Sequence, residues 1–111
     1  MEMITWNDFQ KVHLLVGTIV SAEEFPEAQK PAYRLRVDLG ELGIKNSSAQ
    51  ITALYTKEEL VGKQVLVVAN FPKKQIGPIQ SEVLVTGFAN GDGQIVLATT
   101  DKECPNGARL I

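Results

Sequence analysis

The chain has 111 residues, of which 44% are hydrophobic and 22% charged, proportions that are typical of an ordinary globular domain. This length predicts one domain over residues 1–111, with a core large enough to be stable without cross-links. The formal net charge of −2 argues against a protein that binds nucleic acid through overall basic charge. The one cysteine, Cys104, cannot form an internal disulfide bond and suits a reducing compartment.

The N-terminus shows no sign of a targeting segment. Trp6, Asn7 and Asp8 interrupt it before an apolar stretch can form, so no signal peptide is predicted. No apolar run approaches the roughly 20 residues that a membrane-spanning helix needs. We therefore expect a cytoplasmic protein without membrane insertion.

A short helix is predicted near the start of the chain. Thr5 and Asp8 form a weak variant of a capping box, which indicates a helix over about residues 5–11. Trp6 and Phe9 give this helix an apolar stripe. Because the helix lies outside any strand pattern, its apolar side chains need a surface to pack against.

Three strands are predicted in the first half of the chain. Residues 14–22 form the first, with a bend at Gly17, and a polar loop follows over residues 23–32. Residues 33–39 alternate strictly between apolar and polar side chains, which is typical of a strand with one buried face. Residues 44–52 form a third, more polar strand.

The second half of the chain completes the strand pattern. A helical turn is predicted over residues 57–60, and strands over residues 65–69, 82–88 and 95–98. A turn at residues 90–93 joins the last two strands. Five or more short strands with one brief helix indicate an all-β Greek-key barrel, although this pattern also permits a β-sandwich or an SH3-like barrel.

The segment over residues 60–84 carries the clearest binding signal. After its first, apolar strand, Pro72 ends regular pairing because proline has no N–H to donate. Lys73 and Lys74 then fall on an exposed connection, where a partner can reach them. The polar pair Ser81-Glu82 opens the next predicted strand.

This segment resembles the signature of the small tRNA-binding domain family, which occurs alone or appended to methionyl- and phenylalanyl-tRNA synthetases. The resemblance covers nearly the whole chain, from about residue 8 onward. Two further stretches, Ser47 to Thr52 and Pro105 to Gly107, are similar to one branch of the family, the CsaA-type secretion chaperones. The motifs shared with the wider family are Val16 to Ile19, Pro26 to Ala28, Val37 to Gly40, Gly62-Lys63, Val68 to Lys74, Ile76-Gly77 and Ser81-Glu82.

The resemblance implies a five-stranded OB-fold Greek-key barrel with a short N-terminal helix and a C-terminal extension. The chaperone branch implies a non-catalytic homodimer that holds unfolded or export-bound polypeptides, with the protein-export machinery as a further partner. The wider family implies an alternative, a module that recognises tRNA shape through a basic groove. Val83-Leu84 stands where the synthetase-appended domains commonly have Gly-Met, and the bulkier pair favours the chaperone branch.

A binding groove is predicted on the face of the second and third strands and the adjacent loops, because OB-folds bind ligands there. The apolar residues Phe71, Ile76 and Ile79 flank the two lysines and are expected to be exposed beside a bound chain. The alternative is that all these side chains merely form the solvated side of a sheet. The predicted groove residues are Arg34, Arg36, Asn46, Ser48, Gln50, Phe71, Lys73, Lys74, Ile76, Ser81 and Glu82.

Catalysis has little support in the sequence. The chain has one histidine, His13, and one cysteine, and it contains neither a nucleophile-elbow motif nor a glycine-rich phosphate loop. These residues cannot supply a typical metal-ligand set either. We therefore predict no enzyme activity, no catalytic residue, no metal and no cofactor.

A homodimer is predicted from apolar residues that the barrel does not need. Trp6 and Phe9 lie on the N-terminal helix, and Leu110 and Ile111 end the chain after the last predicted strand. Apolar elements outside a closed core need a partner surface, and a two-fold dimer is the commonest solution.

Overall fold

The computed structural model describes residues 1–111 and contains two short α-helices, one 3-10 helix and nine β-strands. None of the helices has the length and apolarity needed to cross a membrane. The elements, in chain order, are α1 Trp6–Gln10, β1 Leu14–Glu24, β2 Tyr33–Asp38, η1 Gly40–Leu42, β3 Ile44–Ala49, α2 Lys57–Leu60, β4 Gln64–Val68, β5 Lys74–Ile76, β6 Ile79–Ser81, β7 Leu84–Val85, β8 Gly87–Ala89 and β9 Ile95–Leu97.

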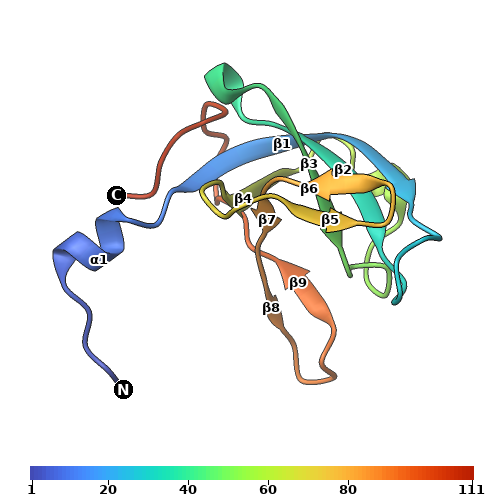
Figure 1. Ribbon diagram of the computed structural model, residues 1–111, viewed down its shortest axis with the longest axis horizontal. Helices are drawn as coiled ribbons and strands as arrows, with labels where there is room; N and C mark the ends of the chain where they lie inside the picture. Colours follow the sequence, from blue (N-terminus) through green and yellow to red (C-terminus); the bar gives the residue numbers. More distant parts are fainter.

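A strongly curved five-stranded antiparallel sheet forms the body of the molecule (Figure 1), with the strand order β3-β2-β1-β4-β7. The 11-residue strand β1 pairs with both β2 and β4, and a register shift between Ile19 and Ser21 bends it. Gly17 permits the close approach of β2, since a Cβ atom there would lie 2.5 Å from Val37 Cγ1. The curvature lets the sheet wrap around one core.

The core is the interior of this curved sheet. The strict alternation of β2 places Leu35 and Val37 inside, both with no exposed surface, and Val65 and Val67 of β4 are equally buried. Leu60, from the short helix α2, closes one end of the core and is also fully buried. The buried face predicted for residues 33–39 is therefore confirmed.

The barrel is closed between β3 and β7 by a side chain instead of a full strand ladder. The main-chain N–H of Glu82 donates to the carbonyl oxygen of Asn46 at 2.8 Å. The main-chain N–H of Asn46 donates in return to Glu82 Oε2 at 3.0 Å. The result is a nearly closed, all-β barrel of the OB-fold type with an N-terminal helix and a C-terminal extension, as predicted.

The region after β4 differs from the prediction in two ways. Residues 72–81 contain the hairpin β5–β6, so Ser81 ends a strand instead of opening one. The strand predicted over residues 82–88 is split into β7 and β8. Thr86 lies at the break: its N–H donates to Leu66 O on β4, while its carbonyl accepts from the N–H of Ala98, which follows β9, so the chain changes pairing partner there.

The expectation that Ile79 is exposed is wrong. Its side chain keeps only 5% of its accessible surface, whereas Phe71 keeps 56% and is exposed as predicted. Ile79 begins β6, which packs against β3, so the hairpin folds this side chain inward. Ile76, at the other strand of the hairpin, is half-buried.

The C-terminal extension adds to the edge of β1 that β2 leaves free. Val16 N–H donates to Ala108 O, and Leu110 N–H donates to Leu14 O, each at 2.9 Å. Gln64 fixes the approach to this segment, since its side-chain amide both donates to Cys104 O at 2.7 Å and accepts from Cys104 N–H at 3.0 Å. Both chain ends therefore lie on the same side of the barrel, away from the projecting hairpin β8–β9 (Figure 1).

Candidate functional site

The outer face of β2 and β3 carries four of the predicted site residues as cross-strand neighbours. Arg34 lies opposite Ser48, and Arg36 lies opposite Asn46. Such neighbours have Cβ atoms about 5 Å apart and present their side chains on one face. The structure therefore brings these two arginines and two polar residues together, as the alternation predicted.

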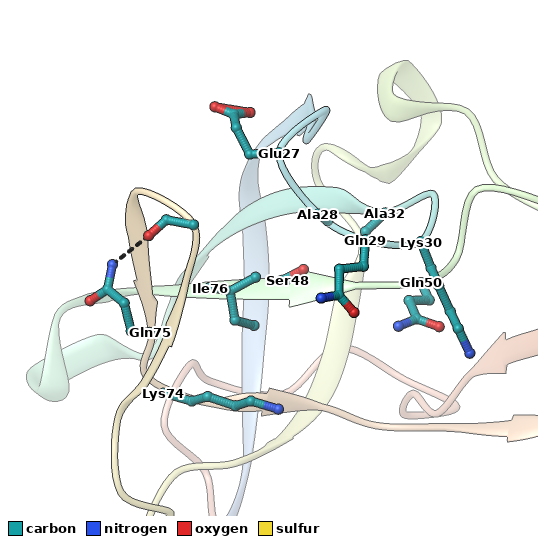
Figure 2. A pocket seen from close by; sticks show the side chains of 11 residues that line it. Glu27, Ala28, Gln29, Lys30, Ala32, Ser48, Gln50, Lys74, Gln75 and Ile76 are labelled. Atoms are coloured by element: carbon teal, nitrogen blue, oxygen red, sulfur yellow. Dashed lines mark hydrogen bonds between the residues drawn. The ribbon is translucent and has the colours of Figure 1, made fainter.

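A cavity of about 510 Å³ lies beside this face, between the loop after β1, strand β3 and the hairpin β5–β6. Figure 2 shows Ile76 of the hairpin beside Ser48 and Lys74 below it, with Gln29 and Lys30 reaching down from the loop and Lys30 passing Gln50. Polar and charged side chains dominate its lining. The loop residues Gln29 and Lys30 were not predicted, although the loops beside this face are a recognised part of OB-fold binding sites.

A smaller and more apolar hollow of about 260 Å³ lies on the other side of Lys74. Phe71 and Pro72 form part of its wall, and Leu84, with 48% of its surface exposed, forms another part. Val83 contributes as well but belongs mainly to the barrel core, where it is 5% exposed. The pair Val83-Leu84 thus fills the core with one side chain and adds apolar surface to this hollow with the other.

A third hollow of about 440 Å³ separates the end of β3 from β7 and the start of β9. Ser48 lines all three hollows, Lys74 the first two, and Leu84 the last two. The three hollows therefore adjoin one another around Ser48 near the end of β3, and we call them together the β3 groove. It combines an exposed apolar wall with polar and basic side chains.

The two adjacent lysines have different surroundings. Lys73 Nζ lies 3.7 Å from Glu82 Oε1 in the only ion pair of the structure, and Lys73 lines none of the three hollows. Lys74 has no acidic partner and lines two of them. Arg34 and Arg36 are likewise outside any ion pair. Three of the four predicted cations are therefore free to attract an anionic or polar ligand, despite the net negative charge of the chain.

Glu82 has a structural position inside the site. Its side chain keeps 19% of its surface and holds Asn46 through the hydrogen bond that closes the barrel. Ser81 is half-buried, and its hydroxyl lies 3.5 Å from Val83 O. Both residues line the apolar hollow, so a ligand there would contact the same segment that closes the barrel.

The residues considered for catalysis form no reactive group. His13 is exposed and its side chain makes no hydrogen bond, while the thiol of Cys104 lies 3.6 Å from Lys102 O. No cluster of three or more His, Cys, Asp or Glu side chains is placed to hold a metal ion.

A model of the family described as "Putative tRNA binding domain" matches residues 14–109 of the chain. The chain belongs to the tRNA-binding domain family. Its structure is similar to the crystal structure of chaperone CsaA from Bacillus anthracis str. Ames, with a TM-score of 0.92 and 46% identity over 99% of this chain and 100% of that one. The CsaA chaperone protein from Picrophilus torridus gives a TM-score of 0.91 and 48% identity over 98% and 100%.

The family also includes parts of much longer proteins. Methionine–tRNA ligase from Leptospira biflexa is 43% identical over 108 residues, which are 96% of this chain but 15% of the ligase. The chain spans about 15% of the length of the curated ligases that it matches. Over nearly the whole given sequence, this member of the tRNA-binding domain family is CsaA-like.

Proposed function

We propose that the protein is a non-catalytic chaperone of the CsaA type that holds unfolded or export-bound polypeptides in the β3 groove. The observation that carries this proposal is the exposed apolar wall of Phe71, Pro72 and Leu84 directly beside the unpaired cation Lys74. Apolar burial contributes about 25 cal/mol per Å² and does not depend on a specific ligand sequence. A cytoplasmic location and contact with the export machinery belong to the same proposal.

A pair of phenylalanine variants tests this proposal. Phe71→Ser removes apolar surface from the groove, whereas Phe88→Ser removes a still more exposed ring, at 73%, from the hairpin β8–β9 outside the groove. We expect Phe71→Ser to weaken suppression of a model client's aggregation by about tenfold and Phe88→Ser to leave it nearly unchanged. Because both rings are mainly exposed, neither variant should lower the melting temperature by more than a few degrees. Equal loss of chaperone activity in both variants would contradict the placement of the site.

A second candidate function is tRNA binding through the same face. The free cations Arg34, Arg36 and Lys74 favour it, because phosphate contacts dominate affinity for nucleic acids. We propose weak binding with a modest dependence on salt, since the groove offers few cations. Lys74→Ala should lower the affinity for all tRNAs similarly and reduce the slope of log affinity against log salt concentration by about 1. Lys73→Ala should change this slope less, because Glu82 already pairs with that lysine. A larger effect of Lys73→Ala than of Lys74→Ala would reject this assignment.

The proposed assembly is a homodimer that uses the end of the barrel where the C-terminal tail lies beside α1 (Figure 1). Trp6 is 67% exposed and stacks on Phe9 with ring centroids 5.2 Å apart, and Leu110 and Ile111 are also exposed. Arg109 donates to Gln10 O and so ties the tail to the helix segment. These contacts support one shared apolar surface of the kind that a second copy covers.

Light scattering tests the homodimer. We expect a particle of twice the 12.1 kDa chain mass at micromolar concentration, and a shift toward monomer in the double variant Trp6→Ser, Ile111→Ser. Substitution is preferable to removing residues 108–111, because Ala108 and Leu110 also pair with β1. A wild-type particle of monomer mass would overturn this part of the proposal.

A further inference from the structure

The edge of β3 that faces away from β2 has a defined hydrogen-bonding direction. In an antiparallel ladder, both main-chain groups of every second residue point toward the neighbouring strand, and those of the intervening residues point away. The N–H and C=O of Asn46 both bond to Glu82, so they point away from β2. The β2–β3 register runs without a shift from Asp38↔Ile44 to Tyr33↔Ala49. The alternation is therefore unbroken along the whole strand.

Ser48 has the same parity as Asn46, so its N–H and C=O also point away from β2. It pairs with no other strand, and no turn or side chain bonds to its main chain. Gln50, two residues further along, has no main-chain hydrogen bond either. Ser48 thus presents an unbonded N–H and C=O pair, and Gln50, one residue past the end of β3, leaves its main-chain groups unbonded as well.

The opposite wall of the groove has a similar edge. Val83 N–H reaches Asn46 O at 3.4 Å, whereas Thr86 N–H donates to Leu66 O on the other side. By the same alternation, the main chain of Val85 faces β3. Between them lies the hollow of about 440 Å³, whose apolar lining includes Ile51, Val85 and Ile95.

We infer that a bound polypeptide adds to the edge of β3 as an extended strand that pairs with Ser48 and Gln50. This inference rests on the proposed chaperone function and specifies how the ligand is held. Main-chain pairing recognises any extended chain, because every residue except proline supplies the same donor and acceptor. The alternating side chains of the added strand would then face the hollow lined by Ile51 and Val85 and, on the other side, the polar face with Lys74.

Natural proteins usually block a free strand edge, because such an edge invites pairing with another chain. On the groove side the edge is open at Ser48 and Gln50, while Glu82 occupies it at Asn46 and so separates this stretch from Ile44, whose main chain is also unbonded at the other end of β3. Lys74 lines the hollows on this side, and its charge disfavours stacking of many copies into a continuous sheet. The arrangement is suited to accepting one short extended segment.

Backbone N-methylation tests this inference directly. The probe is the tightest-binding ten-residue peptide from an overlapping set that covers reduced, carboxymethylated α-lactalbumin, a permanently unfolded chain. Single N-methyl groups introduced at successive positions remove one main-chain donor each and leave every side chain in place. We expect affinity losses of about tenfold at the two positions, two residues apart, whose N–H groups pair with Ser48 and Gln50, and less than twofold at the other positions.

Two variants of the protein give an independent measurement. Ser48→Pro removes the N–H that faces the groove without taking a bond from the β2–β3 ladder, which is the edge position where proline is tolerated. Ser48→Ala keeps that N–H and removes only the hydroxyl. We expect Ser48→Pro to lower the affinity for the peptide about tenfold and Ser48→Ala to lower it less than twofold. Thermal unfolding checks that both variants are folded.

The outcomes separate the two levels of the proposal. If the peptide binds but N-methylation does not lower its affinity, or lowers it without distinguishing alternate positions, the strand-addition inference is wrong. The chaperone proposal would then still stand. Failure of the wild-type protein to bind any of the peptides or the unfolded chain itself would overturn both. If Ser48→Pro does not fold, the N-methyl series on the wild-type protein still decides the question.

Discussion

The two sides of the barrel wall are built differently. Strands β1, β2 and β4 each have hydrogen-bonded neighbours along both edges, including the C-terminal segment that completes β1. Strands β3 and β7 each have one strand neighbour, and the link between them is the segment Glu82-Val83, which bonds to Asn46. Most of the fully buried side chains lie on the first side, and the groove lies on the second. The comparison indicates that paired strands supply stability, while the incompletely paired strands supply the proposed binding surface.

The largest expected effect is on the fully paired side. Leu35→Ala removes a side chain with no exposed surface from the centre of β2 and should lower the free energy of unfolding by about 2–5 kcal/mol. Leu84→Ala, on the groove side, removes a leucine that is 48% exposed and should cost less than about 1 kcal/mol. Urea unfolding of the two variants measures the difference. Similar losses would mean that the groove wall is as important for stability as the core.

The next effect concerns the closure itself. Glu82→Ala removes the carboxylate that accepts Asn46 N–H and should cost about 1–3 kcal/mol, because a partly buried donor loses a charged acceptor. Lys73→Ala removes only the exposed partner of the same carboxylate and should cost about 0–1 kcal/mol. Thermal unfolding distinguishes them. If the lysine variant proves the more damaging, the ion pair and not the hydrogen bond would be holding the barrel closed.

A smaller and local effect is expected where the tail meets β4. Gln64→Leu keeps the size of the side chain but removes its two hydrogen bonds to Cys104. The amides of Ala108 and Leu110 should then exchange with solvent about tenfold faster, because the segment that carries them is less firmly held. Gln75→Leu is the matched control, since Gln75 is exposed and its side chain bonds only to Gly77 O. Unchanged exchange in Gln64→Leu would show that the strand pairing alone anchors the tail.

The same contrast explains how far the sequence predicted the structure. The alternation over residues 33–39 predicted the inward set Tyr33, Leu35, Val37 and Leu39, because a strand in a full ladder has a period of two; the last three are buried, and Tyr33 is partly buried against the core. The family motifs predicted the OB-fold and the face that carries Arg34 and Arg36. Those residues lie on β2, where local pattern and final structure agree.

The groove side was predicted less completely. Strands β5 and β6 have three residues each, too few to show a period, so the hairpin looked like an exposed turn and Ile79 like a surface residue. The hydrogen bond from Asn46 N–H to the Glu82 carboxylate joins residues 36 positions apart, and no local sequence pattern indicates it. The loop residues Gln29 and Lys30 reach the cavity only through the folded arrangement of the β1–β2 connection.

The most direct test of the account is to locate a bound polypeptide by amide chemical shifts. Titrating the isotope-labelled protein with the tightest-binding α-lactalbumin peptide should shift the amide resonances of Ser48, Gln50 and Leu84, all of which line the β3 groove. Phe88, which is more exposed than Leu84 but lies on the projecting hairpin, should remain unshifted. The largest shifts falling at Phe88, or at Trp6 and Ile111 beside the C-terminal tail, would contradict the claim that the β3 groove is the binding site.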